Sequence, residues 1–212
     1  MHLYLSSFRM GDRFRDLLDL AGPGARTAVI ANAVDFIDAE SRRAYAAKVH
    51  DPVADFREAG LDAFDLDLRD HFGRPDSLAA ALADIRLVWC VGGNAFLLRR
   101  AMRQSGFEAA IAGRGDLIYG GWSAGACVAG STLRGLELMD EPDLVVDGYD
   151  PAPVWEGLGL VDYAIVPHFE SEHPEAEAAA RAHHHMTREG IPHRTLRDGD
   201  VIVCEAAPMS IR

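Results

Sequence analysis

The sequence predicts an α/β fold in which a doubly wound, mostly parallel sheet carries helices on both faces. β-rich runs alternate with amphipathic helical stretches along most of the chain, a pattern that implies right-handed βαβ units and a parallel sheet. The length of 212 residues, with 49% hydrophobic and 25% charged residues, suits one α/β domain with a sizeable core. The sequence contains no internal repeats or low-complexity linkers, so we expect residues 1–212 to form one domain.

The first half of the chain alternates most clearly. The stretch "ESRRAYAAKVHDPVADFREAG" carries helix-forming residues and ends at Gly60, a common type of helix C-cap. Pro52 inside this stretch is able to split the helix. We expect strands at 2–7, 27–33, 63–68 and 85–93, with helices at 40–60 and 76–84.

The second half continues the alternation on either side of an irregular segment. Residues 131–160 are rich in Asp, Pro and Gly, and two interpretations of them stay open: a long functional loop, or a surface excursion between strands. We expect helices at 95–115 and 173–190 and strands at 116–123, 163–169, 193–198 and 200–206.

The charge of the chain limits its partners. The net charge of −12 and the isoelectric point near 5.1 exclude a basic surface able to neutralise nucleic acid phosphates or an anionic membrane. The first residues, "MHLYLSSFRMGDR", have no basic segment followed by a long apolar one, and no run reaches the roughly 18 apolar residues of a membrane span. We expect a cytoplasmic protein whose partner is a small molecule or a short peptide.

Cysteine and histidine lack the spacing of a metal site. The three cysteines are isolated and stand in apolar surroundings, which is typical of buried free thiols. The histidines at 183–185 are consecutive on an expected helix, so their side chains diverge and cannot converge on one metal ion. We therefore expect no metal and no organic cofactor.

The stretch "YGGWSAGACVAG" at 119–130 places Ser123 between an apolar run and a helical segment. This strand, turn and helix context, with Gly121 and Gly125 flanking the serine, is what a G-x-S-x-G nucleophile elbow requires. Bulky side chains at the two glycines would clash, and the serine backbone is strained. The pattern predicts a nucleophile near the positive N-terminus of a helix. The alternative is a serine that caps the helix after a glycine-rich turn.

A second glycine-rich junction, "CVGGNAF" at 90–96, favours the catalytic interpretation. Gly92 and Gly93 allow backbone amides to approach a ligand closely, and we expect the amides of Gly93 and Ala124 to form an oxyanion hole. Asn94 is a candidate substrate-binding residue in the same loop. A tight turn before the next helix is the alternative for the glycines, and neither loop has the spacing of a phosphate-binding motif.

A nucleophilic serine needs a base to take its proton and a third group to orient that base. His168 follows the apolar run "YAIVP", so we expect it at the carboxyl end of a strand, on the same rim of the sheet as Ser123. We predict that His168 is the general base. The alternative is a structural histidine at a strand end.

These motifs together resemble the peptidase E or aspartyl dipeptidase family of serine peptidases. The segments "CVGGNAF", "YGGWSAGA" and "VPHF" occur in the order and at the separations of that family, and the resemblance spans nearly the whole chain. It implies a class I glutamine amidotransferase-like (flavodoxin-like) fold, with serine where the amidotransferases have cysteine. It also implies that Ser123 attacks, that His168 is the base, and that Gly93 and Ala124 form the oxyanion hole.

The resemblance leaves the acid of the triad open between two residues. The family's glutamate turn ahead of the final strands corresponds to "LRDGD", which offers the shorter Asp198. The other candidate is an aspartate in a D-x-P segment between serine and histidine, matched by Asp140 in a loop that has extra residues here. We prefer Asp198, with Asp140 second; a turn-forming aspartate is the alternative for either.

The segment after the histidine departs from the arginine- and glycine-rich segment of the dipeptidase. Here "ESEHPEAEAAARAHHH" is mainly acidic, which counts against selectivity for an N-terminal aspartate. Glu170 and Glu172 are candidates to bind a free peptide N-terminus by charge, or else they form a capping box before the next helix. Arg134, Arg181 and Arg194 remain candidates to bind an acidic side chain.

The leading hypothesis is a serine exopeptidase that hydrolyses short peptides through an acyl-enzyme, with Asp-X dipeptides among the candidate substrates. Two alternatives stay open: another acyl hydrolase on the same scaffold, such as a relative of cyanophycinase, and a non-catalytic binding domain. The 131–160 segment is a candidate lid or, through an exposed apolar strip, a homodimer interface.

Overall fold

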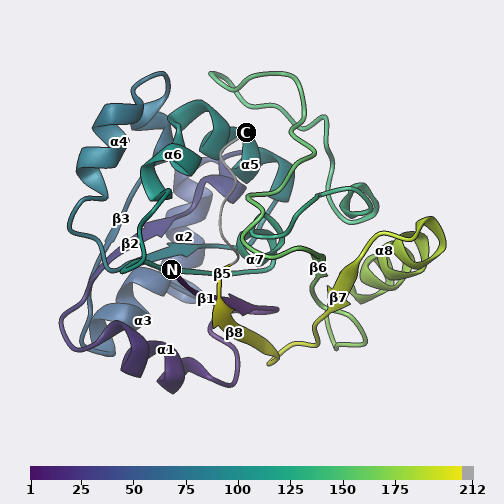
Figure 1. Cartoon of the computed structure of the whole chain (residues 1–212), viewed down its shortest axis with the longest axis horizontal. Coiled ribbons are helices and arrows are strands. Elements are labelled where there is room, and N and C mark those ends of the chain that lie inside the picture. The colour runs from purple at the N-terminus through teal and green to yellow at the C-terminus, as the bar shows by residue number, and fades with distance from the viewer. Residues whose placement is uncertain (207–212) are drawn as a thin grey trace.

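A six-stranded sheet forms the centre of the computed structural model, which describes residues 1–206 (Figure 1). Its strands lie in the order β3-β2-β4-β5-β1-β8. The first five are parallel, and β8 pairs antiparallel with β1 at one edge, so the predicted mostly parallel sheet is confirmed. The strands are β1 (His2–Ser6), β2 (Arg26–Ile30), β3 (Asp62–Asp65), β4 (Leu87–Cys90), β5 (Ile118–Trp122) and β8 (Val201–Glu205).

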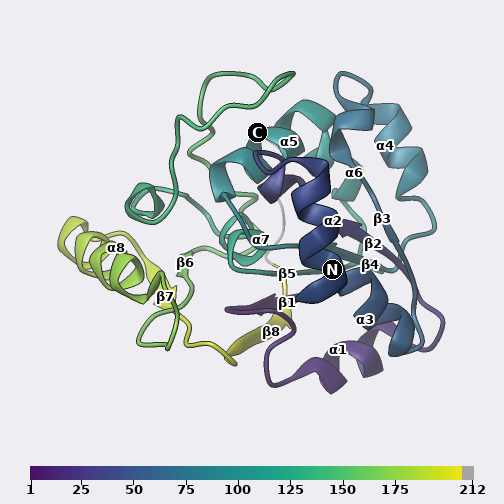
Figure 2. The same ribbon diagram turned by 180° about the vertical axis from the view of Figure 1, so that it is seen from behind.

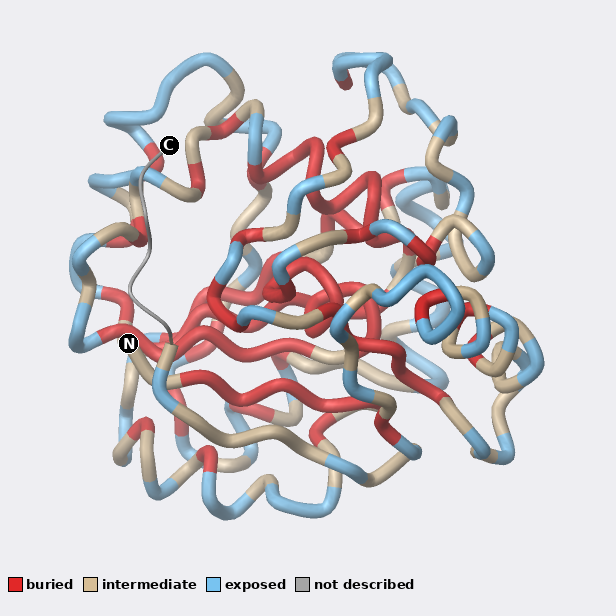
Figure 3. The backbone as a smooth tube through the Cα atoms, turned by 45° about the vertical axis from the view of Figure 1, so that its right-hand side comes forward, coloured by how far each residue is buried: buried red, intermediate tan, exposed pale blue. Residues whose placement is uncertain are grey.

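Helices cover both faces of this sheet, as predicted. In β4, Leu87 and Trp89 pack into one buried cluster with α1 and α3, whereas Val88 and Cys90 pack into another with α5 and α6. This alternation follows from the pleat of a strand, whose successive side chains point to opposite faces. Figure 3 shows buried residues, in red, concentrated at the centre of the molecule, where β1, β2, β4 and β5 lie; the edge strand β8 is only partly buried. The bounds are α1 (Phe14–Ala21), α3 (Pro52–Glu58), α4 (Pro75–Ala81), α5 (Ala95–Ser105), α6 (Phe107–Ile111) and α7 (Ala124–Cys127).

Three helices differ from the sequence-based expectation. The helix expected at 40–60 is split into α2 (Ala39–Lys48) and α3, because Pro52 starts a new helix whose N-terminal amides are capped by Asp51. The helix expected at 95–115 is broken by Gly106, whose φ of 74° is left-handed. Helix α1 was not predicted; it has eight residues and no capping side chain at its start, so its N-terminal signal is weak.

The expected strand at 163–169 does not join the central sheet, which corrects the prediction about its position. Its core, β6 (Ala164–Val166), pairs only with β7 (His193–Thr195) in a separate two-stranded parallel sheet within the described chain. The edge of the central sheet beside β1 is occupied by β8. Helix α8 (Ala176–Glu189) connects β6 to β7, and the three elements form a lobe at one side of the molecule in Figures 1 and 2.

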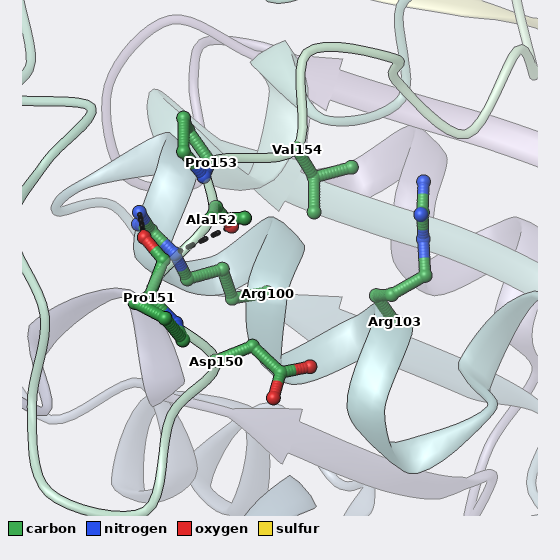
Figure 4. Close-up of a pocket in the computed structure, with 7 residues that line it drawn as sticks. All are labelled: Arg100, Arg103, Asp150, Pro151, Ala152, Pro153 and Val154. Atoms are coloured by element: carbon green, nitrogen blue, oxygen red, sulfur yellow. Dashed lines mark hydrogen bonds between the residues drawn. The ribbon is translucent and has the colours of Figure 1, made fainter.

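The long 131–160 segment is held against α5 by two buried arginines, of which Arg99 donates a hydrogen bond to the carbonyl of Glu156. The guanidinium of Arg100 donates hydrogen bonds to the backbone carbonyls of Pro142, Leu144, Pro151 and Ala152, at distances from 2.6 to 3.2 Å. Figure 4 shows Arg100 beside a small cavity of about 270 Å³ along residues 150–154. These contacts favour the interpretation of the segment as a surface excursion anchored to the domain.

Short 3₁₀ turns follow β2 and β3 and occur once within the long segment: η1 (Asn32–Val34), η2 (Leu68–His71) and η3 (Leu136–Leu138). The buried side chain of Asn32 connects the first two turns, because it accepts a hydrogen bond from the Leu68 N–H and donates one to Asp67. Among residues 1–206, the helices are all too short or too polar to cross a membrane.

Candidate active site

Ser123 occupies a strained turn between β5 and α7. Strand β5 ends at Trp122, α7 begins at Ala124, and the serine between them has φ 48° and ψ −116°. This left-handed conformation is costly for a residue with a Cβ and is typical of functional sites. The Ser123 side chain makes no capping hydrogen bond to the helix, which counts against the simple N-cap alternative.

The two flanking glycines are required by close approach of the backbone. A Cβ built on Gly121 would lie 2.7 Å from the carbonyl oxygen of Cys90, and one on Gly125 would lie 2.1 Å from the same oxygen. Cys90 ends β4, so a side chain at either glycine would push α7 away from the neighbouring strand. This explains physically why the sequence has glycine on both sides of Ser123.

We predict that Gly125→Ala lowers the free energy of unfolding by about 3 kcal/mol or more, because backbone atoms cannot move aside as a flexible side chain can. Chemical denaturation monitored by circular dichroism measures the change. Gly115→Ala is the matched control, since a Cβ there meets nothing within 4 Å; its effect should stay within about 0.5 kcal/mol. Equal stability of the two variants would contradict the close-approach argument.

Ser123 and His168 line one cavity of about 980 Å³. Its wall also contains Gly92, Gly93 and Trp122 from the junctions after β4 and β5. Helix α2, in the foreground of Figure 2, borders the same cavity. The hydroxyl of Ser123 makes no hydrogen bond to any described residue and is therefore available to a ligand. In unliganded sites the contact from nucleophile to base is often long, and it tightens when substrate binds.

His168 is buried and oriented by Asp198. The Nδ1 atom of His168 lies 2.7 Å from Oδ1 of Asp198, while the side chain of His168 is 2% exposed. His168 lies in the turn just past the carboxyl end of β6, with φ 60°. It therefore follows a strand as predicted, but that strand belongs to the two-stranded sheet and not to the central sheet. The imidazole lines the same cavity as Ser123.

Ser7, which follows β1, holds this pair together. Its Oγ accepts a hydrogen bond from the backbone N–H of His168 at 2.8 Å and lies 3.0 Å from Oδ1 of Asp198, to which it can donate. The backbone N–H of Asp198 in turn donates to Oγ of Ser171 at 2.8 Å. These buried contacts fix both side chains, which is how a second layer of residues orients a catalytic histidine.

Two further groups approach the imidazole of His168. The ring of His173 stacks on it with centroids 3.7 Å apart and an interplanar angle of 8°. The carboxylate of Glu175 lies 3.7 Å from its Nε2 atom. Burial lowers the pKa of His168, the charge of His173 lowers it further, and the hydrogen bond to Asp198 opposes both effects. The lowered pKa favours the neutral imidazole, which is able to accept a proton.

The amides predicted to form an oxyanion hole are free. Gly93 has φ 135°, and a Cβ on it would lie 2.5 Å from the carbonyl oxygen of Ala33, so only glycine fits. Within residues 1–206, the backbone N–H groups of Gly93 and Ala124 donate no hydrogen bond. Gly93 lines the same cavity as Ser123, and Ala124 directly follows that serine. Unpaired amides beside a serine are suited to bind a developing oxyanion.

Asp140 and Asn94 lie together at the start of α5, outside the cavity wall. Oδ2 of Asp140 accepts a hydrogen bond from the Ala95 N–H at 2.8 Å, and burial raises its pKa to about 7. Asn94 caps the helix through the Leu97 N–H and donates its amide to the carbonyl of Glu141. Both polar atoms of the Asn94 side chain are thus engaged within the fold.

The predicted charged residues after the histidine also lie away from the cavity wall. Glu170 pairs with Arg197, and Glu172 is exposed. Glu175, three residues beyond Glu172, reaches the cavity instead. The arginines considered for an acidic side chain lie elsewhere: Arg181 pairs with Glu177, Arg134 stacks over Trp155 and Arg194 over Tyr163.

One side-chain cluster in the described chain has the composition of a metal site. Ligand atoms of His168, His173 and Asp198 lie within 4.8 Å of one another. Imidazole and carboxylate suit zinc, but two members of this cluster are already hydrogen-bonded to each other. The cluster is therefore accounted for by the orientation of His168.

Sequence reasoning missed Ser7, His173, Glu175 and the arginines of the cavity wall. Arg42, Arg43 and Arg69 come from α2 and η2, which lie far from the serine motif in the sequence. Only His173 and Glu175 had an available signal: both are polar residues within a few positions of the predicted base. For the others, the folded chain alone brings them to the site.

Comparisons with known proteins find relatives that carry the name peptidase E. A peptidase E of Streptomyces coelicolor is 33% identical over 184 residues, which cover 85% of this chain and 64% of that protein. A peptidase E of Citrobacter koseri is 39% identical over 98 residues, covering 45% of this chain and 39% of that protein. The matched part therefore spans less than two thirds of the length of either relative.

Solved structures and a family profile extend the comparison. A Listeria monocytogenes EGD-e protein that carries the peptidase E name has a TM-score of 0.69 at 18% identity, covering 97% of this chain and 98% of that one. A peptidase from an acI-B1 Actinobacterium has a TM-score of 0.59 at 14% identity, covering 97% and 84%. At these identities the likeness concerns the fold. The profile of Peptidase family S51 matches residues 23–211, most of the chain, and the protein therefore belongs to that family.

Proposed function

We propose that this protein is a serine exopeptidase that hydrolyses short peptides through Ser123, His168 and Asp198. The observation that carries the proposal is the 2.7 Å contact of Asp198 with His168, which lines the same cavity as a serine on a strained elbow. Nucleophile, base and orienting acid are the parts that acyl transfer requires. The family membership supports the same reaction class.

In the first half of the reaction, Oγ of Ser123 attacks the carbonyl carbon of the scissile peptide bond. Nε2 of His168 takes the hydroxyl proton, and the carboxylate of Asp198 stabilises the imidazolium through Nδ1–H. The carbonyl oxygen becomes an oxyanion that accepts hydrogen bonds from the Gly93 and Ala124 amides. Each such donor contributes about 3 kcal/mol in the transition state.

The tetrahedral intermediate then collapses, and its C–N bond breaks. His168 delivers its proton to the leaving nitrogen, which departs as an amine and leaves an ester on Ser123. In the second half, His168 removes a proton from a water molecule, which attacks the ester carbon and forms a second tetrahedral intermediate. Its bond to Oγ of Ser123 then breaks, and His168 returns the proton to that oxygen. The acid is released and the free enzyme is restored.

The cavity supports a small substrate. Its volume of about 980 Å³ is at the upper end of the range for small-molecule sites. Arg43 lines it without an ion pair to any described residue, whereas Arg42 and Arg69 pair with Asp35. An acidic side chain at the N-terminus of a peptide is therefore a substrate feature to include in the test.

The test is amino-acid release from dipeptides and tripeptides with Asp, Glu, Leu, Ala or Lys at the N-terminus, combined with labelling by a fluorophosphonate. Release together with labelling of Ser123 is the expected result. Labelling without release from any peptide would replace the proposal by another acyl hydrolase. A folded protein that neither reacts nor hydrolyses would make Ser123 a turn residue.

We also predict the pH dependence of the reaction. His168 acts as a base only when neutral, and burial lowers its pKa below the ordinary value of 6.5. The acid limb of kcat/KM against pH should therefore have its midpoint below 6.5, with activity retained in mildly acidic buffer. Initial rates between pH 4.5 and 8 measure it. A midpoint above 6.5 would contradict the dominance of burial.

A further inference from the structure

Glu175 lies next to the atom of the proposed base that handles the leaving group. Its Oε2 is 3.7 Å from Nε2 of His168, and its side chain is 46% exposed and lines the cavity. The backbone N–H of Glu175 donates to Nδ1 of His173, whose ring stacks on His168. The carboxylate is thus attached to a segment that packs directly against the proposed base.

The chemistry of peptide hydrolysis determines what Glu175 meets. Nε2 of His168 must come within hydrogen-bond distance, about 3 Å, of the leaving nitrogen in order to protonate it. In a free dipeptide, the α-carboxylate begins two bonds from that nitrogen. The substrate carboxylate and Glu175 would then lie in the same partly buried region. Their separation would be shorter than the Debye length of about 8 Å at physiological salt, so salt would screen their repulsion only partly.

Within residues 1–206, no lysine or arginine lies within ion-pair distance of Glu175, whose only such partner is His168. Asp140 adds a second carboxyl nearby, and the charge of Glu175 contributes to the raised pKa of Asp140. Arginines line the same cavity, but two of them, Arg42 and Arg69, pair with Asp35. The carboxylate nearest to Nε2 of the proposed base therefore has no arginine or lysine paired with it.

From this placement we infer that Glu175 selects the leaving group. The site would disfavour free dipeptides and favour substrates whose leaving amine has no adjacent carboxylate, namely C-terminal amides and longer peptides, with a further preference for a basic side chain. This inference depends on the proposed function and deepens it. Like charges a few ångströms apart at a half-exposed position should change kcat/KM by about tenfold.

The experiment compares kcat/KM for three substrates that share the same N-terminal residue: a dipeptide ending in leucine, its C-terminal amide, and the corresponding lysine amide. The wild-type protein should cleave the leucine amide about tenfold better than the free dipeptide, and the lysine amide best. In Glu175→Gln, both ratios of kcat/KM should fall towards one, because glutamine removes the negative charge. Glutamine also keeps the size of the side chain, so a change in the ratios reports the charge. Thermal melts establish that the variant is folded.

Glu177→Gln is the matched control. Glu177 lies two residues further on, is exposed, pairs with Arg181 and does not line the cavity. It should keep the wild-type preference. A folded Glu175→Gln protein with unchanged preferences would overturn the inference while leaving the exopeptidase intact. Failure of the wild-type protein to cleave any of the three substrates or any peptide of the wider panel would overturn both.

Discussion

Ser123→Ala is expected to abolish peptide hydrolysis, with a loss in kcat of about 10⁶-fold, while the protein remains folded. The alanine variant has no atom that can form the acyl-enzyme, whereas cavity and oxyanion donors persist. Residual hydrolysis then comes only from binding and oxyanion stabilisation. Because alanine keeps the Cβ that Ser123 already has, the left-handed turn at φ 48° acquires no new clash.

The measurement is amino-acid release by the purified variant from the best substrate of the wild-type protein, together with loss of fluorophosphonate labelling. Ser131→Ala is a suitable control, because Ser131 is exposed and lies in the long segment away from the cavity. It should retain full activity. Equal release by the Ser123 variant and the wild-type protein would exclude the elbow as the source of the nucleophile.

Asp198→Asn is expected to lower kcat by about 10⁴-fold, the second largest effect. An asparagine that presents its NH₂ group to Nδ1 would select the tautomer of His168 that carries its proton on Nε2, which cannot accept the proton of Ser123. It would also leave the imidazolium without an anion in a buried site. The contact between His168 and Asp198, 2.7 Å long and reinforced by Ser7, is the reason for expecting so large a loss.

Asp140→Asn is the comparison that separates the two candidate acids. The Asp140 carboxylate caps α5 through the Ala95 N–H, a bond that the amide oxygen of asparagine can also accept. Burial raises the pKa of Asp140 to about 7, so its ionised form is costly in the folded state. We expect kcat of Asp140→Asn to fall by less than about tenfold. A loss as large as that in Asp198→Asn would assign the orienting role to Asp140.

The same substitution has an expected effect on stability. The pKa of Asp140 is higher in the folded protein than its ordinary 3.8, so the folded state binds more protons and loses stability as pH rises from about 4 to 7. Asparagine carries no charge and removes this dependence. We therefore expect the free energy of unfolding of Asp140→Asn, relative to that of the wild-type protein, to be higher at pH 8 than at pH 5. Urea unfolding at the two pH values measures it.

The sequence by itself determined the features that depend on neighbours along the chain. Strands β1 to β5 follow from short apolar runs, and the elbow at Ser123 follows from a strand, two close-approach glycines and a helix within about ten residues. The conformation of such segments is set mainly by local sterics and by the period of the side chains. The mostly parallel sheet with helices on both faces could be inferred from the order of these segments.

The partners of His168 were decided only by the tertiary structure. Asp198 precedes Gly199, and Asp140 lies two residues before Pro142. Both are sequences typical of turns, so local sequence does not distinguish the two candidate acids. Ser7 contacts His168 across 161 positions of the chain, and no local pattern encodes such a contact. Likewise, the tertiary structure places β8 at the edge beside β1, while β6 pairs with β7 in a separate sheet.

Glu175 illustrates the same limit at the level of specificity. From the sequence, Glu170 and Glu172 were the candidates in the acidic segment after His168, and nothing singled out Glu175. In the folded chain, Glu170 pairs with Arg197, Glu172 points to solvent, and Glu175 reaches Nε2 of His168. The difference arises from the turn after β6 and the start of α8, which direct each side chain to different surroundings. The residue types were therefore predictable, whereas their assignment to the site required the packing of distant segments.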